Sequence, residues 1–224
     1  MKLDILYEDE HIIVCYKPAG IPTQTKKLGE QDMVSLLKNY LKGGYVAVIH
    51  RLDQPVEGLL VFAKTPFAAK QLNKGLQGAG FGKHYKAVLW GIPEQKKAVL
   101  EDYLVKDGRT NTSRVCEPSE VDAKKAVLSY EVMVTGKDEG KDFSLVKVKL
   151  DTGRHHQIRV QMANMGCPIW GDAKYNTAMV QDRRFRHIAL CAYRLEFVHP
   201  KTKKKMEFEI EPKGEGFSIL QRYQ

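Results

Sequence analysis

The sequence predicts an α+β fold built on a mixed, largely antiparallel sheet. Several stretches alternate apolar and polar residues with the period of two that strands show, and they outnumber the helical stretches. Strands and helices do not alternate regularly, as they would in a doubly wound parallel fold. With 43% hydrophobic residues in 224 positions, the chain has enough apolar side chains to build a core of ordinary size.

The first half of the chain contains two predicted strands, each followed by a predicted helix. An apolar run over 12–16 reads as a buried strand that Pro18 and Gly20 end, and the run over 58–64 reads as a second one. Asp32 is the predicted N-cap of a helix over 33–41 that Gly43 and Gly44 stop. Its predicted apolar face consists of Met33, Leu36, Leu37, Tyr40 and Leu41.

Thr65 as N-cap and Pro66 at the first helical position predict the next helix. Strands are predicted around Tyr85, over 146–150 and over 206–210, and a short helix around Ile158 and Met162. The stretch 91–125 is polar and poorly patterned. It fits a flexible linker, but its weak strand at 99–105 favours a connection packed against the domain.

The composition favours a polyanionic partner and a reducing compartment. There are 36 Lys and Arg against 27 Asp and Glu, a formal net charge of +9, which makes nucleic acid the leading candidate. The four cysteines are scattered without a CxxC pair, so neither a disulfide framework nor a zinc site is indicated. No apolar stretch approaches the roughly 20 residues of a membrane span. We therefore expect a cytoplasmic protein.

Charged residues meet apolar support in "HRLDQPVEG" and in "LDTGRHHQIRVQM". The neighbouring His155 and His156 suggest a metal site, but adjacent histidines point in different directions and no further ligand lies at the usual spacing. We therefore expect no metal. Asp53 and Arg159 have two interpretations at this point. They form either a structural ion pair or a site in which the guanidinium keeps a functional carboxylate ionised. A glycosidase pair of Asp53 with Glu57 stays open.

Three stretches together resemble the RluA-type pseudouridine synthases. They are "HRLDQPVEGLLVFAK", "KHYKAVLWG" and "LDTGRHHQIRVQMANMGCPIWGDAKY", in the family's order, and the likeness runs from about Ile5 to Pro212. It implies the pseudouridine synthase fold, a bent mixed sheet flanked by helices with a cleft between two subdomains. It also implies an RNA uridine isomerase that needs neither cofactor nor metal.

The resemblance assigns roles to particular residues. Asp53 matches the family's essential aspartate, Tyr85 the aromatic that stacks on the target base, and Arg159 the arginine paired with the aspartate. Arg51 matches the residue that fills the space left by the extruded nucleotide. Further RNA contacts are expected from His50, Arg154, His156 and Gln157.

The chain departs from the family pattern at a few positions. Val56 and Glu57 replace the usual Thr-Ser, Gln161 replaces a His, and Cys191 replaces the His of "LHA". These changes bear on substrate choice more than on catalysis. Because a second carboxylate pointing inward would disfavour an ionised Asp53, we expect Glu57 to face outward or to pair with a cation.

We expect residues 1–224 to form a single catalytic domain without a separate N-terminal RNA-binding domain. The expected substrate is structured RNA, rRNA before tRNA, and the expected state is a monomer without an obligate protein partner. Two rival functions remain. A non-catalytic RNA-binding module of the same fold would have lost Asp53, Tyr85 or Arg159, and a nucleoside or glycoside hydrolase would need a residue that activates water.

Overall fold

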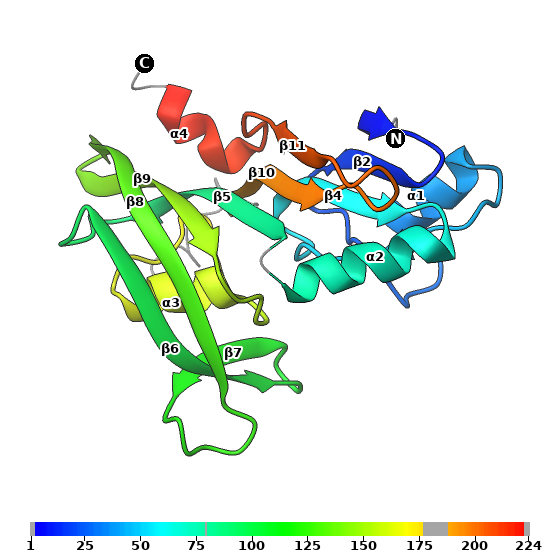
Figure 1. Cartoon of the computed structure of the whole chain (residues 1–224). Helices are drawn as coiled ribbons and strands as arrows, with labels where there is room; N and C mark the ends of the chain where they lie inside the picture. Colours follow the sequence, from blue (N-terminus) through cyan, green and yellow to red (C-terminus); the bar gives the residue numbers. More distant parts are fainter. Residues whose placement is uncertain (1–2, 79, 177–187, 222–224) are drawn as a thin grey trace. The chain divides into compact units, whose positions relative to one another are not determined.

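The computed structural model describes residues 3–78, 80–176 and 188–221. The chain divides into two compact units (Figure 1). Unit 1 comprises Met1–Lys83 and Cys191–Lys213, and unit 2 comprises His84–Leu190 and Gly214–Gln224. No helix in the described part of the chain is both long and apolar enough to cross a membrane.

Unit 1 is a mixed sheet with two helices. Its strand order is β1-β2-β4-β10-β11, and β3 pairs with the C-terminal end of β4. The β10–β4 pair is parallel and the others are antiparallel, which agrees with the predicted mixed, mostly antiparallel sheet. The elements are β1 (Asp4–Glu8), β2 (Ile12–Lys17), α1 (Met33–Tyr40), β3 (Ala47–Val48), β4 (Glu57–Ala63), α2 (Pro66–Gln77), β10 (Leu190–Val198) and β11 (Lys205–Glu209).

Both predicted helix starts in unit 1 are confirmed. The Asp32 side chain accepts a hydrogen bond from the Ser35 backbone, and the Ser35 side chain accepts one from the Asp32 backbone, so α1 begins with a reciprocal capping box. Thr65 caps α2 by accepting from the Ala68 backbone, and Pro66 opens the helix. The predicted apolar face of α1 is wrong at Tyr40, whose side chain is exposed and donates a hydrogen bond to Glu8.

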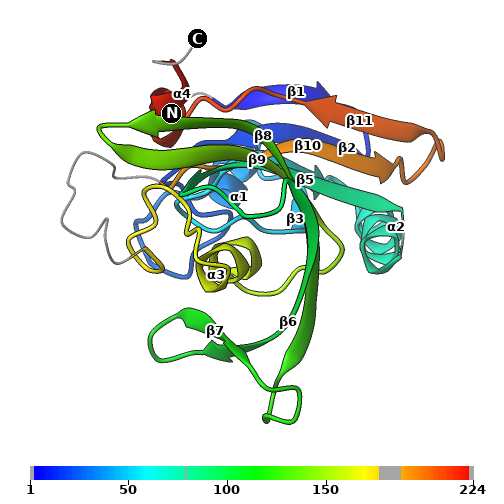
Figure 2. The ribbon, with the colours of Figure 1, turned by 90° about the vertical axis from the view of Figure 1, so that its left-hand side faces the viewer.

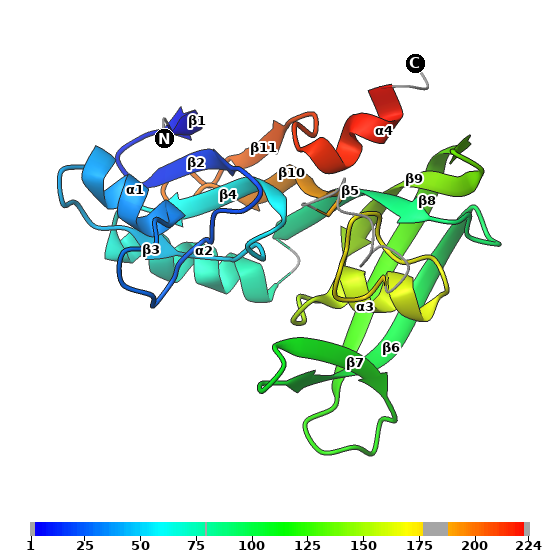
Figure 3. The same ribbon diagram turned by 180° about the vertical axis from the view of Figure 1, so that it is seen from behind.

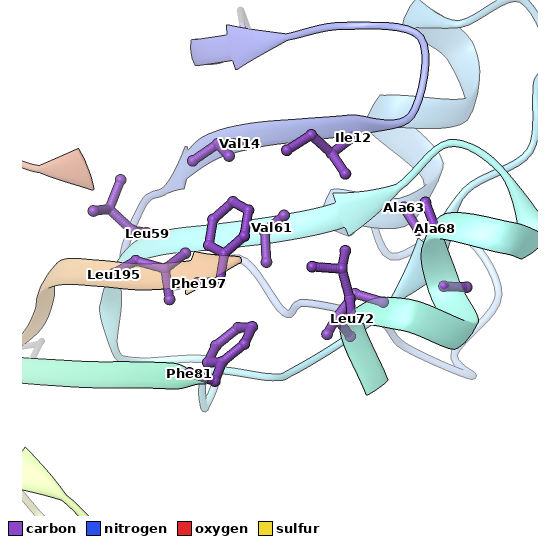
Figure 4. Close-up of a cluster of buried hydrophobic side chains, with 12 residues drawn as sticks. Ile12, Val14, Leu59, Val61, Ala63, Ala68, Leu72, Phe81, Leu195 and Phe197 are labelled. Carbon is purple, nitrogen blue, oxygen red and sulfur yellow. The ribbon is translucent and has the colours of Figure 1, made fainter. Parts of the chain in front are cut away.

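The core of unit 1 lies between its sheet and α2. Seen from behind, α2 runs beside β4, against which it packs (Figure 3). Every residue of β4 is buried. Side chains of β2, β4, β10 and α2 meet the first residue of β5 (Phe81–Trp90) in one cluster (Figure 4). Its labelled members are Ile12, Val14, Leu59, Val61, Ala63, Ala68, Leu72, Phe81, Leu195 and Phe197.

Unit 2 contains five strands, with α3 packed against β6 and β7 (Figure 2). Its strand order is β5-β9-β8-β6-β7. The stretch 91–125 is not a flexible linker, because β6 and β7 form within it. Leu104, Ala126 and Val160 form a core cluster there. The elements are β5 (Phe81–Trp90), β6 (Lys97–Asp107), β7 (Thr112–Cys116), β8 (Lys124–Asp138), β9 (Lys141–Leu150), α3 (Gln157–Asn164), η2 (Glu215–Phe217) and α4 (Ser218–Gln221).

Gly58 permits the close parallel pairing of β4 with β10. Its φ of +132° lies in a region that residues with a Cβ rarely adopt, and a Cβ there would stand 2.5 Å from both the backbone nitrogen and the backbone oxygen of Ala192. Gly75 in α2 differs, because a Cβ there would meet nothing within 4 Å.

We expect Gly58→Ala to lower the free energy of unfolding by more than about 2 kcal/mol, since the strands must separate to admit the methyl group. Gly75→Ala is the matched control and should raise it by about 0.5–1 kcal/mol through helix propensity. Urea unfolding of both variants tests this. Equal stabilities for wild type and Gly58→Ala would show that the close approach is not a constraint.

Candidate active site

Asp53 lies in a tight turn that leads into the buried strand β4. The turn is closed by the Val56 N–H, which donates to the Asp53 carbonyl at 3.0 Å. The Asp53 side chain is half-buried, whereas the residues of β4 that follow are all buried. Asp53 therefore lies in a hydrogen-bonded turn that leads directly into a buried strand.

The residues on both sides of Asp53 are bonded to the segment that follows β2. Thr23 Oγ1 accepts from the Leu52 N–H at 3.1 Å and donates to the Leu52 carbonyl at 3.0 Å. On the other side, the Gln54 carbonyl accepts from the Gly20 N–H at 2.8 Å, and Gln54 Nε2 donates to the Gly20 carbonyl at 3.0 Å. These bonds leave the main chain at Asp53 little freedom.

Lys17 adds three hydrogen bonds to this region. We call these three bonds the Lys17 clamp. The Lys17 side chain is fully buried, and its Nζ donates to the carbonyls of Pro18, Ile21 and Gln54 at 3.0, 2.6 and 3.0 Å. Burial lowers the pKa of Lys17 to about 7, against the attraction of Asp53 and Glu57, which raises it. The sequence analysis missed Lys17. The feature of the sequence that could have identified it is a lysine at the end of an apolar strand, directly before a proline.

Of the two alternatives expected for Glu57, facing outward or pairing with a cation, the outward one is wrong. Glu57 is buried in unit 1, where its Oε2 accepts hydrogen bonds from the Tyr16 hydroxyl and the Lys213 backbone N–H. Burial and Glu57 raise the pKa of Tyr16, so the phenol stays a donor. The expectation that Glu57 pairs with a cation is supported by its attraction to Lys17, which raises the pKa of that lysine against the effect of burial. The carboxylate at this position is thus compensated locally.

Arg159 is held by Asp172, a residue that the sequence analysis did not single out. Both side chains are buried. Arg159 Nε donates to Asp172 Oδ2 and Nη2 to Oδ1, each at 2.7 Å, and the guanidinium carbon lies 5.2 Å from the Tyr175 ring centre. Such a bidentate pair fixes the plane of the guanidinium. Two of its five N–H donors serve Asp172.

Tyr85 and Gln157 are also buried in unit 2. Tyr85 lies in β5. Gln157 is the first residue of α3, and its amide is engaged within the fold. Its Oε1 accepts from the Thr152 hydroxyl at 2.8 Å and from the Arg154 N–H at 3.0 Å, and its Nε2 donates to the Val127 carbonyl at 3.1 Å. These contacts support a role in shaping the chain before α3.

The two histidines predicted to bind RNA are neutral at physiological pH. Burial and then Lys83 lower the pKa of His50 to about 3, and its Nε2 accepts from the Val61 N–H at 3.3 Å. Burial, followed by Arg159 and other cations, lowers the pKa of His156 to about 2. His156 bonds to the Tyr175 hydroxyl at 2.8 Å. Neither brings a positive charge to a phosphate, and their assignment to RNA stays a prediction.

The two arginines predicted to bind RNA are exposed. Arg51 Nη2 donates to Gln24 Oε1 at 2.8 Å, and Arg154 Nε donates to the Lys125 carbonyl at 2.8 Å. Neither forms an ion pair with a carboxylate among the described residues. Within those residues, no three His, Cys, Asp or Glu side chains gather as metal ligands would.

Comparison with known proteins gives one consistent result. Residues 11–164 match the RNA pseudouridylate synthase family. A ribosomal large subunit pseudouridine synthase D from Pseudomonas aeruginosa is 34% identical, over 98% of this chain and 71% of its own length. A tRNA pseudouridine synthase C from Vibrio vulnificus is 28% identical, over 99% of this chain and 96% of its own length.

The solved structure of human RNA Pseudouridylate Synthase Domain Containing 1 has the same fold. It aligns with a TM-score of 0.80 at 23% identity and covers 94% of this chain and 84% of its own. Several of the relatives in sequence are longer, and this chain spans between 66% and 71% of their length.

The Lys17 clamp predicts a measurable pH dependence of stability. The folded pKa of about 7 lies below the ordinary value near 10.5, so above pH 7 the unfolded chain binds more protons than the folded one. The unfolding free energy should therefore gain up to about 1.4 kcal/mol per pH unit between pH 7 and 10 from this group. The unfolding free energy, measured with urea at each pH, should rise more steeply with pH for wild type than for Lys17→Met, by this amount. Identical slopes would mean that Lys17 titrates normally.

The match over most of the chain and the agreement in fold bear out the resemblance drawn from the three motifs: this chain belongs to the RNA pseudouridylate synthase family, and within it to the RluA type.

Proposed function

We propose that this chain converts specific uridines of structured RNA to pseudouridine, with Asp53 as the essential carboxylate. The observation that carries the proposal is the hydrogen-bonded turn around Asp53, which holds the main chain of this residue just before a buried strand. In the reaction the N1–C1′ bond breaks and a C5–C1′ bond forms, while a proton leaves C5 and N1 gains one. Atoms and electrons balance without a cofactor.

Tyr85 and Arg159 are proposed to act on the same uridine as Asp53. A uridine in folded RNA must leave its stack before a protein reaches its sugar, which costs a few kcal/mol. Stacking of the base on an aromatic side chain returns about 1–3 kcal/mol, the role proposed for Tyr85. For Arg159 we propose a charge-assisted bond to Asp53. The rigid pair with Asp172 supports this role, because it sets the direction of the guanidinium in advance.

The proposed substrate is rRNA, with tRNA as the alternative. One relative named for the ribosomal large subunit and one named for tRNA each align with nearly all of this chain. We propose that the two units form one catalytic domain. We further propose that the protein acts in the cytoplasm, as a monomer without an obligate protein partner. The free thiols of Cys15, Cys116, Cys167 and Cys191 support a reducing compartment.

Asp53→Asn should abolish pseudouridine formation, because the amide keeps the shape of the carboxylate but loses its charge and nucleophilicity. The matched control is Asp151→Asn, which changes an exposed aspartate outside the site. The measurement is a single-turnover assay on unmodified rRNA and tRNA transcripts, with nucleosides quantified by mass spectrometry. RNA affinity and melting temperature should be unchanged. A rate above about a tenth of wild type would contradict the role of Asp53.

Arg51→Ala should slow the single-turnover reaction far more than it weakens RNA binding. The proposed role is to occupy the place of the extruded nucleotide, and the side chain is exposed with an amide partner, so its removal should cost little stability. Lys38→Ala, which removes an exposed cation from α1, is the control. A lowered melting temperature with an unchanged rate for the folded fraction would reject the role in flipping.

A further inference from the structure

Unit 2 contains a cavity of about 410 Å³ that neither the Asp53 turn nor Tyr85 touches. It lies where β6 and β7 pair, beside the start of β8 and the segment before α3, a region that Figure 2 shows. Its volume falls in the range of small-molecule sites, about 300–1,000 Å³. The lining residues are Leu104, Val105, Lys106, Ser113, Asp122, Lys124, Gly153, Arg154 and His155.

The cavity wall carries an excess of positive charge. Lys106, Lys124 and Arg154 are exposed and form no ion pair among the described residues, and Asp122 is the one carboxylate of the lining. The bond from Arg154 Nε to the Lys125 carbonyl, 2.8 Å long, anchors that guanidinium at one edge. Three cations against one anion suit a ligand with a negative charge.

A fixed aromatic ring forms another part of the wall. His155 Nε2 lies 3.2 Å from Asn111 Oδ1, which can only accept, so that nitrogen carries the proton. His155 Nδ1 then accepts from the Ser113 hydroxyl at 2.8 Å. The ring also stacks on His156 with centroids 3.8 Å apart. Bonds to both nitrogens and the stack hold the ring in one orientation before any ligand arrives.

The apolar part of the wall comes from Leu104 and Val105 of β6. The cavity therefore combines a cationic side, an aromatic ring and an apolar floor. A phosphate suits the first, and the ribose and base of the same nucleotide suit the others. The low pKa of His156, which Lys106 helps to depress after larger effects of burial and Arg159, agrees with a positive potential in this region.

We propose that this cavity is an RNA subsite that takes one nucleotide of the substrate chain, apart from the uridine that meets Asp53. Lys106, Lys124 and Arg154 hold its phosphate, and His155 with Leu104 and Val105 contacts its sugar and base. The subsite rests on the proposed function, because it assumes an RNA substrate. It gives the basic chain a defined place of contact in unit 2, through phosphate contacts that do not read sequence.

The subsite is tested by removing its three cations together, as Lys106→Gln, Lys124→Gln and Arg154→Gln in one chain. The control triple removes the same charge elsewhere, as Lys96→Gln, Lys149→Gln and Lys201→Gln, all exposed. The probe is a fluorescein-labelled decauridylate, with affinity measured by anisotropy between 50 and 300 mM KCl. Melting temperatures should be unchanged in both chains, since every altered side chain is exposed.

We expect the subsite triple to weaken binding at least tenfold at the lowest salt and the control triple less than threefold. Loss of one phosphate contact should make the slope of log K against log salt shallower by about 0.7. Equal losses in the two triples would overturn the subsite, since only overall charge would then matter. An unchanged affinity in the subsite triple would overturn it as well.

A photocrosslink locates the contact independently of charge. Decauridylate carrying one 5-iodouridine should crosslink to the peptide that contains His155 in wild type and not in the subsite triple. A crosslink that persists in the triple, or never involves this peptide or β6, overturns the subsite.

The same proteins are assayed for pseudouridine on rRNA and tRNA transcripts. A wild type that forms pseudouridine but does not use the cavity rejects the subsite alone. A wild type that binds through the cavity but forms no pseudouridine rejects the proposed function alone.

Discussion

The turn around Asp53 depends on the hydrogen bonds that the buried ammonium group of Lys17 donates to three backbone carbonyls. A buried lysine is costly unless its charge is compensated. Here three backbone carbonyls and the attraction of two carboxylates compensate it in part, and burial still lowers its pKa to about 7. Because one of the carbonyls belongs to Gln54, the same group joins the end of β2 to the residue next to Asp53. Thr23 bonds to Leu52 on the other side. Removing the ammonium would leave those carbonyls unsatisfied in a dry environment.

Unit 2 uses a comparable device for its arginine. The buried pair of Arg159 with Asp172 fixes the guanidinium plane, and the Tyr175 hydroxyl connects this region to the backbone of β7 through Ser113. An ion pair of this kind adds little net stability, because desolvation offsets most of the attraction. Its benefit is orientation. Polar side chains that are positioned before a substrate arrives need no reorganisation when it binds.

The charges available for RNA are lysines and arginines rather than histidines. Burial keeps His50 and His156 neutral, whereas Arg51 and Arg154 keep exposed guanidinium groups. His50 directly precedes Arg51, and His156 follows Arg154 by two positions, so each motif combines a buried imidazole with an exposed cation. The imidazole groups thus belong to the buried structure, while the guanidinium groups beside them stay in contact with solvent.

The sequence by itself determined the local elements and the family. Capping residues and apolar periodicity depend on neighbours within a few positions, which is why the starts of α1 and α2 and the strand β2 were predictable from Asp32, Thr65 and the run after Ile12. The three motifs identified the family because their residues stand at fixed spacing, and Asp53 and Arg159 followed from that match.

Tertiary structure alone decided the partners that lie far apart in the chain. The inward position of Glu57 depends on Tyr16 and on the backbone of Lys213, 156 positions later. The burial of Lys17 depends on a carbonyl 37 positions away. The polar stretch after Gly91 became β6 and β7 because β8 pairs with β6, although its own pattern is weak. Such contacts arise only when the chain folds, since no local propensity encodes which distant group will satisfy a buried charge.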